Sequence, residues 1–123
     1  MALILIADDD ELVVDYVREL LSSRGHVVGA LNDGTPVKNV VELKRPDLVI
    51  LDCSMPGLPG VEALRQIRTS QSCYATPVLM LTGRRSKADE DIAFRAGADD
   101  YLRKPFDPDQ LIMRVEELLA KHA

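Results

Sequence analysis

The sequence has no tryptophan, few other aromatic residues and only two cysteines. Cys53 and Cys73 are too few for a disulfide framework and lack the spacing of metal ligands, so we expect two reduced thiols. No apolar run approaches the roughly 20 residues of a membrane-spanning helix, and the first residues lack the basic segment of a signal peptide. These absences favour a protein of the cytoplasm that does not contact membranes.

Basic residues are also in deficit, since 15 lysines and arginines stand against 20 aspartates and glutamates, for a net charge of -5. This charge would repel nucleic acid and anionic membrane surfaces, so we expect a bound cation and no direct nucleic-acid partner. The 123 residues, 46% of them hydrophobic and 28% charged, suit one globular domain. We predict a single domain over residues 1–123, either complete in itself or the front part of a longer protein.

Short apolar runs alternate with helical patterns along the chain. The runs at 3–7, 47–51 and 77–81 are almost wholly apolar, which is typical of strands buried on both faces of a parallel sheet. Weaker strands are expected at 26–31 and 100–102. Five strands alternating with five helices predict an α/β, doubly wound domain, in which helices cover both faces of a parallel sheet. The helices are expected at 11–24, from 36, at 61–69, at 86–96 and from 108.

Several residues mark the expected ends of these helices. Gly25 is a natural left-handed stop for the first helix. Thr35 is the expected cap of the second helix, with Pro36 at its first position, and Asp107 is the expected cap of the fifth. The helix at 86–96 has a sparse apolar face, so we expect it to be loosely held.

Residues that carry chemistry stand at the ends of four of the predicted strands. Asp8 and Asp9 follow the first strand, and Asp52 follows the third. Thr82 and Lys104 follow the fourth and the fifth. Ligands of such a sheet bind at the carboxyl ends of its strands. If the first, third and fourth strands are neighbours, the carboxylates converge and require a cation, and oxygen ligands suit Mg²⁺ better than zinc or copper.

This set of groups could transfer a phosphoryl group onto a carboxylate. Asp52 would attack phosphorus in line, Mg²⁺ and Lys104 would neutralise the equatorial oxygens, and the Thr82 hydroxyl would bond a third oxygen. Each residue alone also has a structural explanation, because Asp8 and Asp9 can begin a helix and the others can be turn, strand-end or solvated residues. Their joint placement favours Asp52 as a phosphoacceptor.

Several short segments form a specific set when they are taken together and in order, although each alone would be weak evidence. They are the apolar strand ending in Asp8-Asp9, the run from Pro46 to Asp52, Met55-Pro56-Gly57 with Gly60, Leu81-Thr82-Gly83, the run from Gly97 to Tyr101, and Lys104-Pro105-Phe106. Over essentially its whole length the chain resembles the response-regulator receiver family of two-component signalling, the CheY-like superfamily. The resemblance implies a five-stranded sheet in the order 2-1-3-4-5.

The resemblance also implies a metal and a phosphodonor. Asp9, Asp52 and the backbone carbonyl of Ser54 would ligate Mg²⁺, with Asp8 acting directly or through a metal-bound water. The donor would be a phosphohistidine of a histidine kinase or phosphotransfer protein. The domain would not be an enzyme beyond its own Mg²⁺-dependent phosphorylation and dephosphorylation.

Thr82 and Tyr101 match the family's switch pair, in which the hydroxyl moves toward the phosphoryl group and the aromatic side chain rotates inward. The surface that changes would comprise the fourth helix, the fifth strand and the fifth helix, and a downstream output domain or protein would read it. Taken alone, Tyr101 is a half-buried aromatic residue of an edge strand. The Lys104-Pro105 pair matches a peptide bond that is usually cis in this family.

Two departures from the family pattern concern the phosphoryl site. Ser54 and Arg84 occupy variable positions beside it, and Gly83 stands where alanine is more frequent. These variable positions are thought to influence the lifetime of the phosphate. We expect an altered hydrolysis rate, whose direction the sequence does not decide.

A further departure concerns self-association. Asp99, Asp100 and Arg114 resemble part of the charged dimer contact of receivers attached to winged-helix transcription factors. Glu90 and Gln110, however, replace an expected basic and an expected acidic residue. We expect at most a weak homodimer.

Three other functions fit parts of the pattern. Asp8 and Asp10 have the D-x-D spacing of a haloacid dehalogenase-type phosphatase, but Leu12 stands where that class usually has threonine or valine, and Asp52 would have no role. A flavin-binding module of the same fold would need a Ser/Thr-rich phosphate loop where the three aspartates stand. The third is a receiver-like interaction domain that is never phosphorylated, against which the complete acidic cluster argues.

Overall fold

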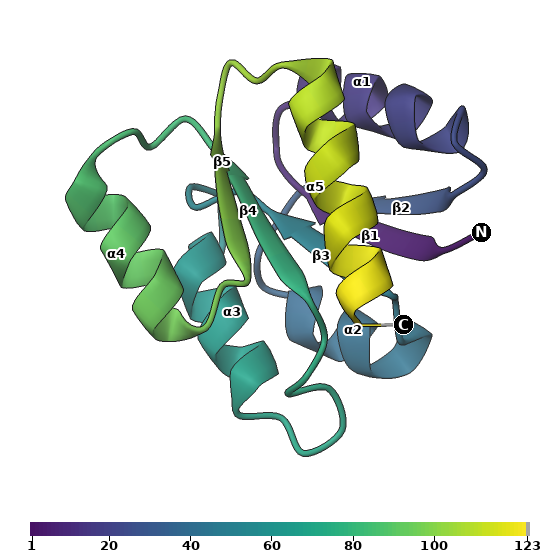
Figure 1. Cartoon of the computed structure of the whole chain (residues 1–123). Coiled ribbons are helices and arrows are strands. Elements are labelled where there is room, and N and C mark those ends of the chain that lie inside the picture. The colour runs from purple at the N-terminus through teal and green to yellow at the C-terminus, as the bar shows by residue number, and fades with distance from the viewer. Residues whose placement is uncertain (123) are drawn as a thin grey trace.

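Five strands alternate with five helices in the computed structural model, which describes residues 1–122 (Figure 1). The strands are β1 (Leu3–Ala7), β2 (Val27–Leu31), β3 (Leu48–Leu51), β4 (Val78–Thr82) and β5 (Asp100–Arg103). The helices are α1 (Glu11–Ser22), α2 (Val37–Lys44), α3 (Gly60–Arg68), α4 (Lys87–Ala96) and α5 (Pro108–Lys121). All neighbouring strands pair in parallel, in the order β2-β1-β3-β4-β5. The predicted doubly wound fold and its strand order are confirmed.

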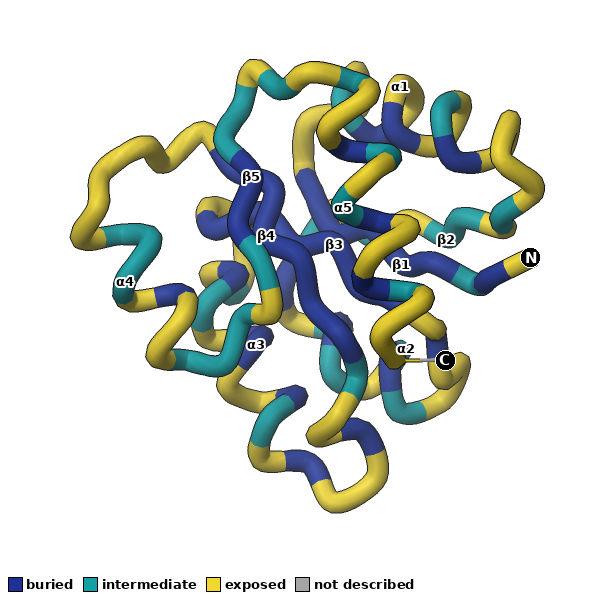
Figure 2. Tube along the Cα trace, in the orientation of Figure 1, coloured by how far each residue is buried: buried dark blue, intermediate teal, exposed yellow. Residues whose placement is uncertain are grey.

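The sheet carries an apolar layer on each face, because side chains alternate along its strands. β1 contributes Ile4 and Ile6 to one layer and Leu5 and Ala7 to the other. α1 and α5 cover the first layer, and α2, α3 and α4 cover the second (Figure 1 and Figure 2). Every residue of β3 and β4 is buried, in agreement with their unbroken apolar runs. This burial fixes the register of the central strands and therefore the position of their ends.

Side chains cap three of the helices at their first turn. Asp10 accepts hydrogen bonds from the backbone N–H groups of Leu12 and Val13 at the start of α1. Ser86 and Asp107 cap α4 and α5 in the same way. The predicted cap of the fifth helix, Asp107, is therefore correct.

The start of α2 differs from the prediction. The helix begins at Val37, with Pro36 in the capping position and no side-chain cap. The backbone N–H of Thr35 donates to Asp33 Oδ1 at 2.7 Å, so Thr35 belongs to the turn before the helix. The prediction that Thr35 caps the second helix is wrong, because this turn delays the first helical residue.

α4 has the least apolar anchoring of the five helices. Of its 10 residues only Ala93 is buried, whereas α3 buries four of its residues. A helix with so small a buried face has few packing contacts to hold it in one position. The sparse apolar face read from the sequence is thus a real property of α4.

The two cysteines are free and buried, Cys53 in the loop after β3 and Cys73 between α3 and β4. Within residues 1–122, none of the helices combines the length and the apolar character that crossing a membrane requires.

Candidate functional site

Three carboxylates converge at the edge of the sheet where β1 and β3 end. The two strands are neighbours, and Ala7 pairs with Leu51, so Asp8 and Asp52 both follow paired residues. Asp9 is next along the chain, and one carboxylate oxygen from each aspartate lies within 4.8 Å of the others. Asp8 and Asp52 are buried, and Asp9 is exposed. The structure therefore brings together the acids that the sequence places at these strand ends.

Lys104 reaches the same cluster from the end of β5. Its Nζ lies 2.6 Å from Asp8 Oδ2 and 3.4 Å from Asp52 Oδ2. The backbone N–H of Lys104 donates to the carbonyl oxygen of Thr82 at 2.8 Å, which holds the lysine backbone beside the end of β4. The peptide bond between Lys104 and Pro105 is cis, as the resemblance implies.

The charges of this cluster do not cancel. Burial raises the pKa of Asp8, although the hydrogen bond from Lys104 acts in the opposite direction. Burial by itself would lower the pKa of Lys104, but the bond to Asp8 and the charge of Asp52 outweigh it, and that pKa is raised. Among residues 1–122 the ion pairs to these acids come from Lys104 alone, so one ammonium faces three carboxylates. A divalent cation would neutralise the excess.

The donor atoms of the cluster fit a hard cation such as Mg²⁺. All three side chains offer carboxylate oxygens, which suit Mg²⁺ better than zinc or copper. Ser54, whose backbone carbonyl the resemblance adds to the ligands, lies in the loop after Asp52, and its N–H donates to Asp52 Oδ1 at 3.4 Å. Asp10 is occupied as the cap of α1 and does not belong to the cluster.

A close backbone contact shapes the loop that follows Asp52. The N–H of Gly60 donates to the carbonyl oxygen of Cys53 at 2.9 Å. A Cβ atom at position 60 would lie only 1.8 Å from the backbone oxygen of Asp52, so no other residue fits there without displacing the loop. The glycine that the sequence shows as part of a motif is thus a steric requirement of the site.

Thr82 and Tyr101 lie on the neighbouring strands β4 and β5, where Tyr101 pairs with Met80 and Thr82 pairs with Arg103. Thr82 is fully buried, and its Oγ1 accepts a hydrogen bond from the N–H of Arg84 at 3.3 Å. Tyr101 is only 5% exposed, and its hydroxyl donates to the carbonyl oxygen of Arg84 at 2.8 Å. Although β5 is an edge strand, Phe94 of α4 and Arg103 cover the Tyr101 ring. The aromatic ring is therefore buried and directed inward, not half-buried.

Arg84 connects the two loops that border the acidic cluster. Its Nε donates to Ser54 Oγ at 2.9 Å, and its Nη1 lies 3.8 Å from Asp89 Oδ1 in the first turn of α4. The sequence singles out positions 54 and 84 separately, but nothing in it indicates that they bond to each other. A hollow of about 370 Å³ opens here and is lined by Asp9, Cys53, Ser54, Met55, Pro59 and Arg84.

Cys53 is a residue of the site that sequence reasoning missed. From the sequence it is only a reduced thiol, but in the structure it is 6% exposed and directly follows Asp52. Its side chain belongs to the same buried apolar layer as Tyr101. Burial raises its pKa, so the group is a neutral thiol. Its position directly after the candidate phosphoacceptor is the one signal that could have pointed to it.

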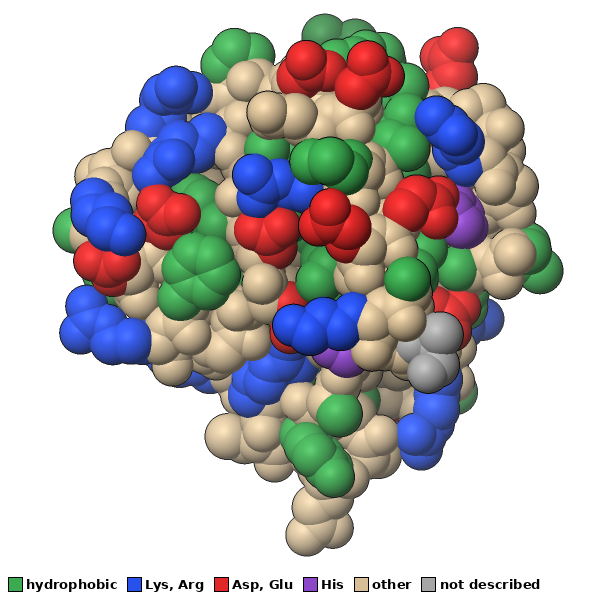
Figure 3. Space-filling model, in the orientation of Figure 1, with side chains coloured by type: hydrophobic (Ala, Val, Ile, Leu, Met, Phe, Trp, Pro, Cys, Tyr) green, Lys and Arg blue, Asp and Glu red, His purple; other side chains and the backbone are tan. Residues whose placement is uncertain are grey.

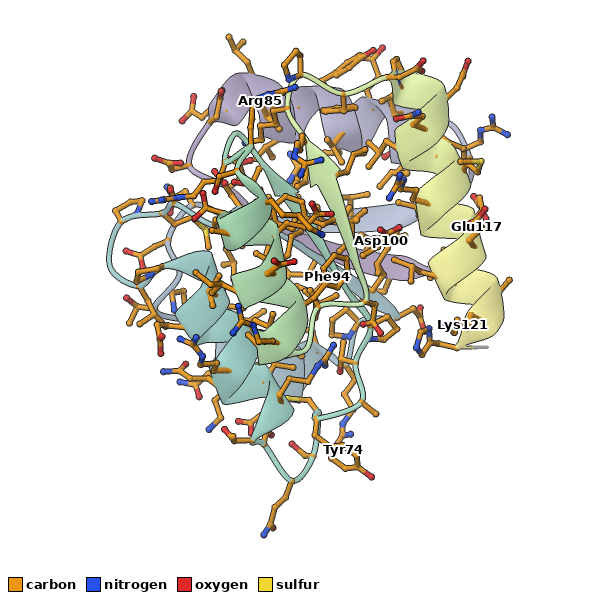
Figure 4. All side chains as sticks on the ribbon, turned by 60° about the vertical axis from the view of Figure 1, so that its left-hand side comes forward. Tyr74, Arg85, Phe94, Asp100, Glu117 and Lys121 are labelled. Carbon is orange, nitrogen blue, oxygen red and sulfur yellow. The ribbon has the colours of Figure 1, made fainter. Side chains whose placement is uncertain are left out.

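Charged residues of both signs gather on the surface formed by α4, β5 and α5, with hydrophobic side chains between them (Figure 3). Several pair within the chain: Arg114 Nη1 lies 2.7 Å from Asp100 Oδ1, and Arg103 Nη2 lies 2.5 Å from Glu90 Oε2. Figure 4 shows Phe94 on α4 beside the neighbouring β5, which carries Asp100. Residues that resemble a charged dimer contact thus have partners inside the chain, and the weak homodimer stays a prediction.

Comparison with known proteins identifies the family. The response regulator receiver domain matches residues 4–116. Response regulator MprA of Mycobacterium leprae is 41% identical over 118 residues, which make up 96% of this chain and 51% of that protein. The chain therefore spans about half the length of the curated relatives it matches.

Solved structures agree with this family. The receiver domain of the Francisella response regulator 1452 superposes with a TM-score of 0.92 at 28% identity and covers 100% of both chains. The receiver domain of the sensor histidine kinase PA1611 from Pseudomonas aeruginosa has a TM-score of 0.89 at 28% identity, covering 97% of this chain and 98% of that one. That receiver has a magnesium ion coordinated in its active site cleft. The chain belongs to the response regulator receiver domain family of two-component signalling.

Proposed function

We propose that this domain accepts a phosphoryl group on Asp52 from the phosphohistidine of a histidine kinase or phosphotransfer protein. The observation that carries the proposal is the position of Lys104, whose ammonium lies 2.6 Å from Asp8 and 3.4 Å from Asp52. The three carboxylates within 4.8 Å of one another supply the rest of the charge pattern. A positioned carboxylate, an ammonium and an acidic metal site together are what phosphoryl transfer to aspartate requires.

In the proposed transfer, Asp52 is the one residue that forms a covalent bond. A carboxylate oxygen of Asp52 forms a bond to phosphorus while the bond from phosphorus to the donor nitrogen breaks, and the electron pair of that bond returns to nitrogen. Lys104 neutralises charge on the phosphoryl oxygens, and the Thr82 hydroxyl bonds one of them after leaving the N–H of Arg84. These residues act by position and charge.

The metal of the proposed site is Mg²⁺. Asp9, Asp52 and the backbone carbonyl of Ser54 would hold it, with Asp8 acting directly or through a water molecule. When bound, it would neutralise the excess of acid and polarise the phosphoryl group. The magnesium ion in the cleft of the related PA1611 receiver supports this choice.

We further propose that the phosphorylated domain signals through the surface of α4, β5 and α5. Arg84 supports this route because its backbone bonds both Thr82 and Tyr101, and its side chain approaches Asp89 of α4. A downstream output domain or protein would read the changed surface, in the cytoplasm, where two-component kinases present their phosphohistidine. The domain would catalyse nothing beyond its own phosphorylation and dephosphorylation.

The test is phosphorylation by a small-molecule donor. Incubation with Mg²⁺ and acetyl phosphate or phosphoramidate should add the mass of one phosphoryl group to the intact protein. Asp52→Asn should lose the adduct, and EDTA should prevent it, whereas the exposed Asp15→Asn on α1 serves as a matched control and should keep it. An unmodified wild-type protein, or an adduct that persists in Asp52→Asn, would contradict the proposal.

An assay of phosphate release distinguishes a receiver domain from the alternative function, a phosphatase. A haloacid dehalogenase-type phosphatase would use Asp8 together with Asp10, yet Asp10 caps α1 and lies outside the acidic cluster. Steady release of phosphate from phosphate esters, lost in Asp10→Asn, would favour that class over a receiver.

A further inference from the structure

The turn after β2 carries none of the residues assigned to the phosphoryl chemistry, yet it contacts the loop that does. We call residues 32–36 the β2 turn and residues 53–59, which follow Asp52, the Asp52 loop. Gly34 of the β2 turn is buried, and its backbone N–H donates to the carbonyl oxygen of Pro56 at 3.2 Å. Two segments that are distant in the sequence are therefore joined through their backbones.

The contact is so close that only glycine fits at position 34. A Cβ atom there would lie 1.8 Å from the backbone oxygen of Leu58 and 2.8 Å from its carbonyl carbon. The obstacle is backbone, so no rotation of a side chain can relieve it, and the Asp52 loop would have to move. The N–H of Leu58 also donates to the carbonyl oxygen of Pro56, at 2.9 Å, so the bond from Gly34 and the steric contact act on the same turn of the loop.

A second glycine makes the contact reciprocal. Gly57 of the Asp52 loop has a φ of +80°, and a Cβ atom there would lie 2.2 Å from Asp33 Oδ1 and 2.4 Å from Thr35 Oγ1. The same oxygen of Asp33 accepts the N–H of Thr35 at 2.7 Å, which holds the β2 turn closed. Each segment presents a glycine to the other, so a displacement of one displaces the other.

The Asp52 loop also carries a proposed ligand of the metal. Ser54, whose backbone carbonyl is that ligand, donates its N–H to Asp52 Oδ1 at 3.4 Å. Only Met55 separates Ser54 from Pro56, and the Met55 side chain is buried in the layer beneath α3 and α4. Because this anchor limits how the short segment can adjust, a displacement at Pro56 is passed on to Ser54.

We propose that Gly34 is a positioning residue of the metal site, which fixes the Asp52 loop and with it the carbonyl of Ser54. The role of Ser54 as a ligand rests on the proposed function, but the coupling of the two segments does not. Binding of Mg²⁺ is sensitive to such a displacement because this ion demands near-ideal octahedral geometry. Residues that orient metal ligands commonly contribute about 10- to 100-fold to the affinity.

Titration with MgCl₂ followed by ¹H–¹⁵N NMR tests both parts of this inference. In the metal-free protein, Gly34→Ala should shift the amide resonances of residues 53–59, and it should raise the dissociation constant for Mg²⁺ by about tenfold or more. Gly29→Ala in β2 is the matched control, because a Cβ atom there meets only Leu5 Cδ1, at the ordinary distance of 3.8 Å. It should keep the wild-type loop resonances and the wild-type dissociation constant.

A second control separates positioning from a general loss of stability. Ile4→Val removes one methyl group from the layer beneath α1 and α5, so it lowers the stability without touching either segment. This variant should bind Mg²⁺ as the wild type does. An unchanged dissociation constant in Gly34→Ala, or an equal increase in Gly29→Ala or Ile4→Val, would overturn the proposal.

A second pair of variants serves if Gly34→Ala does not fold. Asp33→Ala removes the oxygen that holds the β2 turn closed, whereas Asp33→Asn loses the same charge and keeps that acceptor. Asp33→Ala should bind Mg²⁺ more weakly than Asp33→Asn, and equal affinities of the two would overturn the proposal. Failure of the proposed function would appear separately, as a wild-type protein that gains no phosphoryl adduct. The metal-free resonances of residues 53–59 would still decide whether the β2 turn positions the Asp52 loop.

Discussion

At the scale of single residues, the bond between Arg84 and Ser54 spans the opening beside the acidic cluster. Arg84 Nε lies 2.9 Å from Ser54 Oγ, and both residues line the hollow that also contains Asp9 and Cys53, the residue after Asp52. A side chain that bridges this opening should slow the attack of water on an aspartyl phosphate. The structure thus suggests a direction for the altered phosphate lifetime that the sequence leaves open.

Arg84→Ala and Ser54→Ala should therefore each hydrolyse the phosphate faster. If the lost hydrogen bond contributes about 1 kcal/mol to the barrier, the rate of phosphate hydrolysis should rise about fivefold. Because both variants break the same bond, the double variant should be no faster than either single one. Decay of the phosphorylated protein, followed by intact mass after removal of the phosphodonor, measures the rate, with the exposed Arg95→Ala as control. Opposite effects of the two single variants would contradict this account.

Sequence reasoning succeeds at residues whose position follows from the backbone and fails at those whose role depends on side-chain direction. Asp8 and Asp52 could be placed together because each ends a buried apolar strand, and buried strands have a fixed register. The contact of Arg84 with Ser54 could not be predicted, because both lie in loops with no periodic pattern. Cys53 was missed for a similar reason, since only the packed interior shows that it shares a buried layer with Tyr101.

At the scale of elements, α4 is held at its two ends by different means. The guanidinium of Arg68 in α3 donates to the backbone oxygens of Gly97, Tyr74 and Thr76, and it pairs with Asp99 at 3.0 Å. These bonds tie the end of α4 to α3 and to the start of β5. The beginning of α4 is held by the loop that approaches the acidic cluster. This arrangement suits a helix whose first turn moves while its last turn stays in place.

Arg68→Ala should loosen the fixed end of α4. The variant leaves several backbone oxygens without a charged donor, and the free energy of unfolding should fall by about 2 kcal/mol. Urea denaturation measures the loss, and amide exchange should rise at the end of α4. Arg65→Ala, on the same helix, is the control because Arg65 pairs only with the exposed Glu62 in the structure of residues 1–122. Equal stability of the two variants would show that Arg68 does not anchor α4.

The order of the elements was predictable, but several of their ends were not. The strands follow from their apolar runs and the helices from residues repeated at helical spacing, so both are visible in the sequence. The end of α1 at Ser22 and the start of α2 at Val37 depend on turns formed by a few residues around Gly25 and Asp33. Such turns compete with the helix by single hydrogen bonds, which the pattern of apolar residues does not record.

At the scale of the whole molecule, folding itself brings like charges together. The chain has a net charge of -5, and the strand order places three of its carboxylates within 4.8 Å of one another against the single bonded ammonium of Lys104 within residues 1–122. The unfolded chain does not hold these acids together, so their repulsion acts against the folded state. A cation that binds only the folded arrangement stabilises it by mass action.

Mg²⁺ should therefore raise the melting temperature of the domain. At a concentration of Mg²⁺ tenfold above its dissociation constant the gain is about 1.4 kcal/mol, which corresponds to about 5 °C for a domain of this size. Asp9→Asn should melt higher than the wild type in EDTA, because it removes one of the clustered charges, and should lose most of the response to Mg²⁺. Glu117→Gln changes the net charge equally on α5, away from the cluster, and should keep the full response (Figure 4). An equal rise in melting temperature for Asp9→Asn and the wild type would place the cation elsewhere on the molecule.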